Sequence, residues 1–291
     1  LGPRNPVRSV ANGDGTQTIE DMGPLDRERM KTFDDEVLSE GFDFLELAKE
    51  SDQPFFLWMN STRMHYPTYV PDEWKGVSGQ GKYADGLLQH DAWVGSLLGK
   101  LDDLGFSENT IVIYHADNGP QTSLWPDGGI TPYRSEKFTN WEGAYRVPGA
   151  VRWPGRIPSG TVSNEIMSNL DWFPTLLAAA GEVDIVEKLR EGHELNGKPY
   201  RVHLDGYNQL PLLTGETEEG ARQEFFYFTD NGGVAAMRFR DWKLVFSEQR
   251  GTALGAWQEP MIPLSFPKLY NLRTDPFETA DFNSNSYDHI H

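Results

Sequence analysis

The chain has 291 residues, enough for one large domain or one and a half ordinary ones, and its net charge is −18. It has no cysteine, which excludes disulfides, thiolate metal sites and a cysteine nucleophile within these residues. The acidic balance argues against nucleic acid and anionic membranes as partners, and no apolar run is long enough for a membrane span. Any site for an anion must therefore be made positive locally, by a cation or by focused basic side chains.

The first third of the chain predicts loop, helix and strand in that order. Residues 1–25 are rich in turn-forming residues and are expected to be loop. Apolar residues at helical spacing predict a helix over residues 26–50. The short apolar run "QPFFLWMN" at residues 53–60 predicts a buried, parallel strand, followed by a loop that contains His65.

The same alternation then repeats. A helix is predicted over residues 82–104, with Gly105 at its C-terminal cap. "NTIVIYHADNG", residues 109–119, predicts a second buried strand and its terminal loop. This order favours an α/β fold with a doubly wound mixed sheet, in which ligands lie beyond the carboxyl ends of the strands.

The second half of the chain changes character. Residues 121–148 form a loop far longer than an ordinary connection, which indicates a functional or disordered segment. A short strand follows in "GAVRWPG", and "DWFPTLLAAAG" predicts a helix that Asp171 caps and Gly181 ends. Closely spaced apolar runs after residue 221 predict a small antiparallel sheet. The expected organisation is an α/β portion at 1–185, a linker at 186–220 and a C-terminal antiparallel β subdomain at 221–291.

Three places in this pattern carry residues suited to anion or metal chemistry. Asp117 and Asn118 follow a predicted strand and offer hard oxygen ligands of the kind that Ca²⁺ and Mg²⁺ prefer, although a plain Asx turn is the alternative. His65 lies in a loop after a predicted strand and is either a proton donor or anion contact, or a packed or solvated histidine. Lys137 matters only if its ammonium group points at an anion, and otherwise it is a solvated lysine.

Several other polar residues are interpreted as structural. His115 lies inside a strand, and His90 is expected to pack on its helix. Arg146 is expected to pack or to form an ion pair at the start of a strand. Glu142 is expected to hold the long loop through hydrogen bonds, with an approach to the site as the alternative. The triad Asp-Asn-Gly recurs at 230–232 between two predicted strands, where we expect it to form a tight hairpin with positive φ at Asn231 and Gly232.

Taken together, these segments resemble the sulfatase family of the alkaline phosphatase superfamily, and the variant "TNWEG" is closest to bacterial arylsulfatase-like members. The matching motifs occur in the family's order and cover most of residues 26–280: "FFLWMNSTRMHYPTYVP", "YADGLLQHDAWVGSLLGKLDDLGFSENTIVIYHADNGP", "KFTNWEGAYRVPGAVRWPGRIP", "SNLDWFPTLLAAAG" and "DWKLVF" with "LYNLRTDPFE". Ala144 replaces a more common glycine of the third motif.

The resemblance implies a sulfuric ester hydrolase whose substrate is a small-molecule sulfate monoester. Asp117 and Asn118 would be calcium ligands, with Mg²⁺ or another divalent cation as the second choice. Lys137 and His65 would contact the sulfate and the leaving oxygen, and His65 would protonate the leaving group. Each role makes physical sense because charge builds up on the leaving oxygen during cleavage.

Two parts of the family's site have no counterpart here. No Cys/Ser-x-Pro/Ala-x-Arg motif is present, so the resemblance implies that the formylglycine nucleophile lies outside this chain. The resemblance implies the same for the Asp-Asp pair that completes the calcium site in the N-terminal half of the family's fold. The chain therefore resembles the C-terminal part of a sulfatase, with an N-terminal half expected in the intact protein. We expect a soluble bacterial protein, cytoplasmic or periplasmic, and the oligomeric state stays open.

Two alternatives remain at this stage. The first is a relative that hydrolyses phosphate monoesters, phosphate diesters or phosphonate esters, because the superfamily shares its metal and anion chemistry. The second is an inactive fragment or a non-catalytic binding protein. If these residues are the whole product, we expect no turnover.

Overall fold

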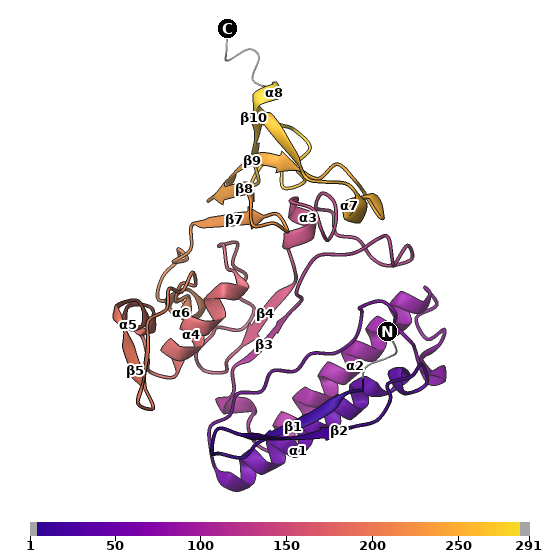
Figure 1. The fold of residues 1–291 in the computed structure, drawn as a ribbon, viewed down its shortest axis with the longest axis vertical. Helices are drawn as coiled ribbons and strands as arrows, with labels where there is room; N and C mark the ends of the chain where they lie inside the picture. The colour runs from indigo at the N-terminus through magenta and orange to yellow at the C-terminus, as the bar shows by residue number, and fades with distance from the viewer. Residues whose placement is uncertain (1–4, 286–291) are drawn as a thin grey trace. The chain divides into compact units, whose positions relative to one another are not determined.

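A computed structural model of the chain describes residues 5–285, which divide into two compact units (Figure 1). The N-terminal unit comprises residues up to 107 together with 124–128, and the C-terminal unit comprises 108–123 and the chain from 129 onward. In the part of the chain that is described, no helix is both long and apolar enough to cross a membrane. The domain boundaries expected at 185 and 221 stay a prediction.

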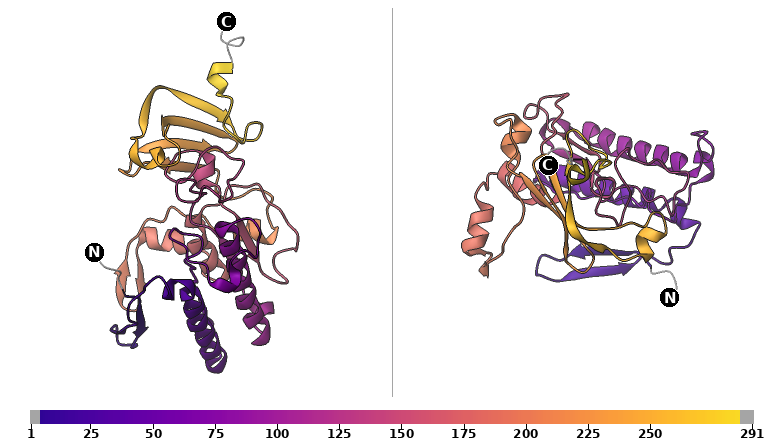
Figure 2. Two further views of the ribbon diagram at one scale, coloured as in Figure 1. Left: turned by 90° about the vertical axis from the view of Figure 1, so that its right-hand side faces the viewer. Right: turned by 90° about the horizontal axis from the view of Figure 1, so that it is seen from above.

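Two long helices dominate the N-terminal unit. Helix α1, Phe33–Ser51, and helix α2, Lys82–Asp103, lie side by side (Figure 2) and confirm both predicted helices. The start of α1 is later than predicted because Arg29–Lys31 forms a separate 3₁₀ turn, η1. Gly105, with φ of +71°, ends α2 as predicted, since its amide donates to Asp102 O.

The predicted strand at 53–60 does not form within residues 5–285. The segment is extended, and its side chains alternate between partly buried and exposed. Phe55 packs edge-on against Phe44 of α1, with ring centroids 6.3 Å apart. Phe56 and Trp58 face the other way and are 70% and 72% exposed. The prediction of a buried, parallel strand was therefore wrong for the described residues. A strand needs a neighbour for its backbone hydrogen bonds, and no described strand pairs with this segment.

The loop expected at 1–25 contains a β-hairpin instead. Strand β1, Val7–Ala11, pairs antiparallel with strand β2, Gln17–Asp21. The glycine-rich stretch between them was correctly interpreted as a turn, since Gly13 and Gly15 both have positive φ. Every residue of the two strands is exposed, so neither has the apolar alternation from which a strand is predicted.

The C-terminal unit contains the remaining strands. Strand β3, Val112–His115, pairs antiparallel with β4, Gly149–Arg152, as a two-stranded ribbon. The predicted antiparallel meander is confirmed as a four-stranded sheet in the order β10-β9-β8-β7 (orange and yellow in Figure 1), with the bounds Glu224–Phe228 (β7), Val234–Phe239 (β8), Trp242–Glu248 (β9) and Ile262–Asn271 (β10).

Short elements fill the other connections. The region expected to be a linker carries ordered pieces of its own: helix α5, Ile185–Glu191, the hairpin β5, His193–Leu195, with β6, Lys198–Tyr200, and helix α6, Leu210–Thr214. The remaining elements are η2, Asp72–Trp74, η3, Ser107–Asn109, α3, Glu142–Tyr145, η4, Asn169–Asp171, α4, Trp172–Ala179, α7, Gly255–Gln258, and α8, Phe282–Asn285.

Asp171 does not cap its helix in the way the sequence suggested. Ser168 is the residue whose hydroxyl accepts from the first turn, while the Asp171 carboxylate accepts from the Ser168 amide at 2.9 Å. The same carboxylate is fully buried and pairs with the Arg222 guanidinium, 2.7 Å away, which fastens η4 to the strand region before β7. A charge buried this deeply requires its partner.

Removal of that partner should be costly. Arg222→Ala is expected to lower the free energy of unfolding by about 3–5 kcal/mol, because it leaves the Asp171 carboxylate buried and unpaired. Urea unfolding at neutral pH measures the change. Arg190→Ala is the matched control, since Arg190 pairs with Glu187 but is 60% exposed, and it should change stability by less than about 1 kcal/mol. Equal effects of the two substitutions would contradict the account.

Candidate active site

The first Asp-Asn-Gly triad lies just beyond β3 in the C-terminal unit. The Asn118 amide donates to Asp117 Oδ1 at 2.9 Å, and Asn118 Nδ2 donates to Gly119 O at 2.9 Å. The chain bends at Asp117 and Asn118. The bond to the Asp117 carboxylate comes from the next residue and not from the second one along, so the Asx turn that was the alternative does not form. The second bond directs Asn118 Oδ1 away from the Gly119 carbonyl, and Asp117 is exposed, so oxygen atoms of both side chains stay available to a cation.

Gly119 and Gly143 allow two loops to approach at backbone distance. The Gly119 amide donates to Ala144 O at 2.9 Å, and a Cβ atom on Gly119 would lie only 1.7 Å from Gly143 O. The Gly143 amide donates in turn to Arg134 O at 2.7 Å, and a Cβ there would lie 2.2 Å from Ser135 O. Only glycine fits at either position.

A backbone hydrogen bond ties Lys137 to the chain that follows the triad. The Lys137 amide donates to Pro120 O at 2.9 Å, so its backbone is fixed to the chain that leaves the Asp117 bend. The preceding residue, Glu136, is buried, and its carboxylate accepts from the Thr122 amide at 2.6 Å and from the Ala253 amide at 2.8 Å. The structure therefore fixes the backbone of Lys137 to the residue that follows the Asp-Asn-Gly triad. A shared site of the Lys137 ammonium group with Asp117 and Asn118 stays a prediction.

A buried ion network around Glu142 holds the C-terminal end of the loop at 121–148. Lys243 Nζ, in strand β9, lies 3.1 Å from Glu142 Oε1 and 2.8 Å from Glu278 Oε1, and all three side chains are almost fully buried. Tyr227 OH donates to Glu142 Oε1 at 2.5 Å, and Arg146 Nε donates to Glu142 Oε2 at 2.7 Å. The expected ion pair of Arg146 and the loop-holding role of Glu142 are both confirmed.

The charges of this network shift one another's pKa values. Burial raises the pKa of Glu142, but Lys243, Tyr227 and Arg146 outweigh burial and lower it to about 2. Burial raises the pKa of Glu278, and the charge of Glu142 adds to that rise against the effect of Lys243. The pKa of Tyr227 is raised well above its usual value by burial and by the adjacent Glu142. Glu142 is therefore the carboxylate that stays charged.

The pH dependence of the stability of Glu142→Gln tests the lowered pKa of Glu142. A depressed folded-state pKa contributes stability that is present above the unfolded value of about 4.3 and is lost as pH falls toward 2. We expect the variant to be less stable than the parent by roughly 1.5–3 kcal/mol at pH 7, and the difference to shrink below pH 4. Urea unfolding from pH 7 to pH 3 measures it, with the exposed Glu218→Gln as control. A difference that does not change with pH would refute the depressed pKa.

His65 lies in the N-terminal unit, on the loop after the extended segment. The side chain is exposed, the His65 amide donates to Thr62 O at 2.9 Å, and Thr68 Oγ1 donates to His65 O at 2.8 Å. The loop is anchored by buried Arg63, which pairs with Asp34 at 3.2 Å. Because the two units are described separately, a shared site of His65 with Lys137 stays a prediction.

The other polar residues match their structural interpretation. His115 Nδ1 lies 3.1 Å from Ala116 O, and His90 stacks on Trp93 with ring centroids 6.3 Å apart. The second triad turns the hairpin between β7 and β8, where the Thr229 amide donates to Gly233 O at 2.8 Å. Of its residues only Gly232 has positive φ, +81°, so the expectation for Asn231 was wrong. The turn uses one left-handed residue, as three-residue hairpin loops do.

Sequence reasoning missed Lys243 and Glu278, although one signal for Lys243 was present. In "WKLVF" the alternation of a strand places Lys243 on the same face as Val245, which is fully buried. A lysine at a buried strand position requires a carboxylate partner. Glu278 offered no such pattern, because it follows the strand in an irregular segment.

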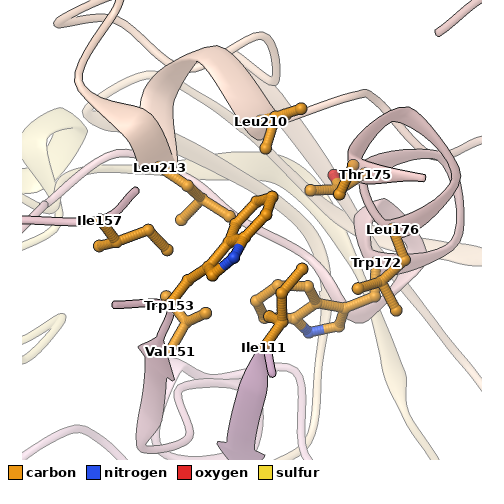
Figure 3. Close-up of a pocket in the computed structure, with 10 residues that line it drawn as sticks. Ile111, Val151, Trp153, Ile157, Trp172, Thr175, Leu176, Leu210 and Leu213 are labelled. Carbon is orange, nitrogen blue, oxygen red and sulfur yellow. The ribbon is translucent and has the colours of Figure 1, made fainter. Parts of the chain in front are cut away.

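An apolar pocket in the same unit is not the site (Figure 3). Its lining contains no charged side chain, and Ile111, Val151, Trp153 and Trp172 project into it from around β3, β4 and α4. Ile111 precedes β3, whereas Asp117 follows it, and at ~3.3 Å per residue the two are separated by roughly 20 Å along the strand. The pocket is therefore a packing gap at the opposite end of β3.

Comparison with known proteins identifies the family. Residues 4–182 match the sulfatase family. The chain belongs to the sulfatases. It is 35% identical to human arylsulfatase A over 81% of this chain and 46% of that protein. It is 36% identical to canine N-acetylgalactosamine-6-sulfatase over 76% of this chain and 39% of that protein. It thus spans about half the length of the curated relatives it matches.

The fold agrees with this assignment. The solved structure of the sulfatase PsFucS1 from Pseudoalteromonas sp. superposes with a TM-score of 0.81 and 26% sequence identity, and covers 94% of this chain and 55% of that one. The α/β arrangement followed by a C-terminal antiparallel sheet is therefore that of a sulfatase, and sulfatases generally use a divalent metal ion.

The residues present fit part of such a metal site. Asp117 and Asn118 supply one carboxylate and one amide oxygen, whereas Ca²⁺ takes six to eight oxygen ligands. Within residues 5–285 no group of three or more acidic, histidine or cysteine side chains is arranged to hold a metal ion. Two oxygen donors cannot complete such a site by themselves, and their chemistry suits a hard cation.

Proposed function

We propose that the full-length protein is a calcium-assisted sulfuric ester hydrolase of the arylsulfatase type, acting on a small-molecule sulfate monoester. The observation that supports the proposal is the bond from the Lys137 amide to Pro120 O, which ties the Lys137 backbone to the segment directly after Asp117 and Asn118. A cationic side chain next to hard oxygen ligands suits a tetrahedral dianionic or monoanionic group. Membership of the sulfatase family supports sulfate as that group.

Asp117, Asn118 and Lys137 have separate proposed roles. Asp117 and Asn118 would hold the cation, which when bound neutralises charge on the sulfate oxygens. Lys137 binds a sulfate oxygen and opposes the charge that develops on the leaving oxygen. Among the described residues Lys137 makes no ion pair, and its Nζ has only the Phe138 ring, 5.6 Å away, as a charge-stabilising contact. The ammonium group is therefore available to an anion.

His65 is proposed to donate a proton to the leaving oxygen. Its exposed imidazole and its anchored backbone suit a group that meets substrate. The nucleophile and the remaining metal ligands are proposed to lie in the part of the relatives' length that this chain does not span. A doubly wound sheet of the alkaline phosphatase type would be completed there too, next to the unpaired segment at 53–60.

Two substitutions test the catalytic roles. Lys137→Ala and His65→Ala should each lower kcat/KM for an aryl sulfate by roughly 10²–10³-fold in the full-length protein, because each removes a group that opposes charge in the transition state. Lys198→Ala and His203→Ala, at exposed positions, are the matched controls. Near-parental rates in both test variants would refute the assignment, and faster hydrolysis of a phosphate ester would favour a phosphatase.

The second Asp-Asn-Gly triad provides the control for the metal site. Asp117→Ala should weaken calcium binding at least tenfold and reduce activity with it, because one charged ligand is lost. Asp230→Ala changes the same residue in the same tripeptide at the β7–β8 hairpin and should leave calcium binding unchanged. Isothermal titration calorimetry compares the two variants. Equal affinities would exclude Asp117 as a ligand.

A further inference from the structure

Four aromatic side chains gather around the His65 loop of the N-terminal unit: Tyr66, Tyr69, Tyr83 and Trp125, here called the aromatic cluster. Trp125 is its centre, with the Tyr83 ring 5.5 Å and the Tyr66 ring 6.1 Å from its centroid, both edge-on. Trp125 Nε1 donates to Met64 O at 2.8 Å, the carbonyl that directly precedes His65. The cluster and the candidate proton donor therefore share one loop.

The local chain is shaped to hold these rings in place. A Cβ atom on Gly128 would lie 3.0 Å from Trp125 Cβ and 3.1 Å from Tyr83 Cδ2, so glycine at this position lets the rings pack. Residues 124–128 pack within the N-terminal unit, although the chain on both sides of them belongs to the other unit. The indole is thus fixed by a hydrogen bond and by close packing, which makes it a rigid surface.

The cluster is only partly covered. Tyr66 is 49% exposed, and the rings of Tyr69, Tyr83 and Trp125 are partly buried. The exposed Lys82 places its ammonium group 5.9 Å from the Trp125 ring centroid and 5.5 Å from that of Tyr69. It gives the cluster a local positive charge in a chain whose net charge is −18. Rigid, partly exposed rings beside a cation suit an anionic ligand that carries a flat apolar face.

We propose that the aromatic cluster is the subsite for the leaving group of the sulfate ester, and that it binds the apolar face of a ring. An aryl ring and a pyranose ring share that chemistry. The proposal rests on the proposed function for the identity of the ester, whereas ring binding itself is independent of turnover. Trp125 and Tyr66 would then set substrate preference through KM, while His65 on the same loop acts on the bond that breaks.

Kinetics with three esters test the subsite. In Trp125→Ala we expect KM for phenyl sulfate or for a sulfated monosaccharide to rise about tenfold with kcat nearly unchanged, and KM for methyl sulfate, which has no ring, to stay within twofold. Trp125→Phe should retain most of the affinity, because it keeps a ring. Phe266→Ala, at a 72% exposed position on β10, is the control. The ester whose KM rises in Trp125→Ala shows whether the subsite binds an aryl ring or a pyranose ring.

Two further measurements keep the outcome decisive. Tyr66→Ala removes an exposed ring, should fold normally, and should raise KM for the same ester about threefold. Calorimetric titration with phenol or a methyl pyranoside measures ring binding without hydrolysis, and Trp125→Ala should abolish it. If no sulfate ester is hydrolysed but ring binding is lost in the variant, the proposed function fails and the subsite stands. Unchanged KM and unchanged ring binding in folded Trp125→Ala and Tyr66→Ala would overturn the subsite.

Discussion

The close backbone contact at Gly119 and Gly143 is the constraint on which the candidate site depends. Two loops that are far apart in sequence touch there without side chains between them, at a position where a Cβ atom on Gly119 would lie 1.7 Å from Gly143 O. This contact and the bond from the Lys137 amide to Pro120 O fix the backbone of the segments that carry the proposed ligands and the proposed sulfate-binding lysine. Chemistry that relies on fixed charges requires such spacing before substrate arrives.

The C-terminal sheet stabilises the loop that carries Gly143, through contacts of strand β9 with Asn140 and Glu142. Lys243 of β9 is buried between Glu142 and Glu278, and Asn140 O accepts from it as well, at 2.8 Å. A buried lysine with two carboxylates is not a strong source of net stability, because removing the charges from water costs about as much as their attraction returns. It is specific, however, since few other arrangements give the buried ammonium group of Lys243 its partners. We interpret the sheet as the part that fixes the long loop in one conformation.

Much of this architecture was predictable from local patterns, and the rest depended on contacts that no pattern records. The two long helices, the meander and the hairpin at the second Asp-Asn-Gly triad followed from periodicity and turn chemistry. The β1–β2 hairpin was missed because its strands have no apolar face, and the segment around Trp58 was taken for a paired strand because pairing is a property of the neighbour. Lys137, Asp117 and Asn118 were singled out by residue type and position and given roles by family motifs, and those roles stay proposals. Glu278 was found only in three dimensions.

A crystal structure of the full-length protein with calcium and sulfate tests the central claim most directly. We predict one anomalous calcium peak about 2.3–2.6 Å from an oxygen of Asp117 and from Asn118 Oδ1. We also predict a sulfate oxygen within hydrogen-bond reach of Lys137 Nζ, and an unchanged bond from the Gly119 amide to Ala144 O. Calcium and sulfate bound elsewhere, with Asp117 and Lys137 both facing solvent, would contradict the account.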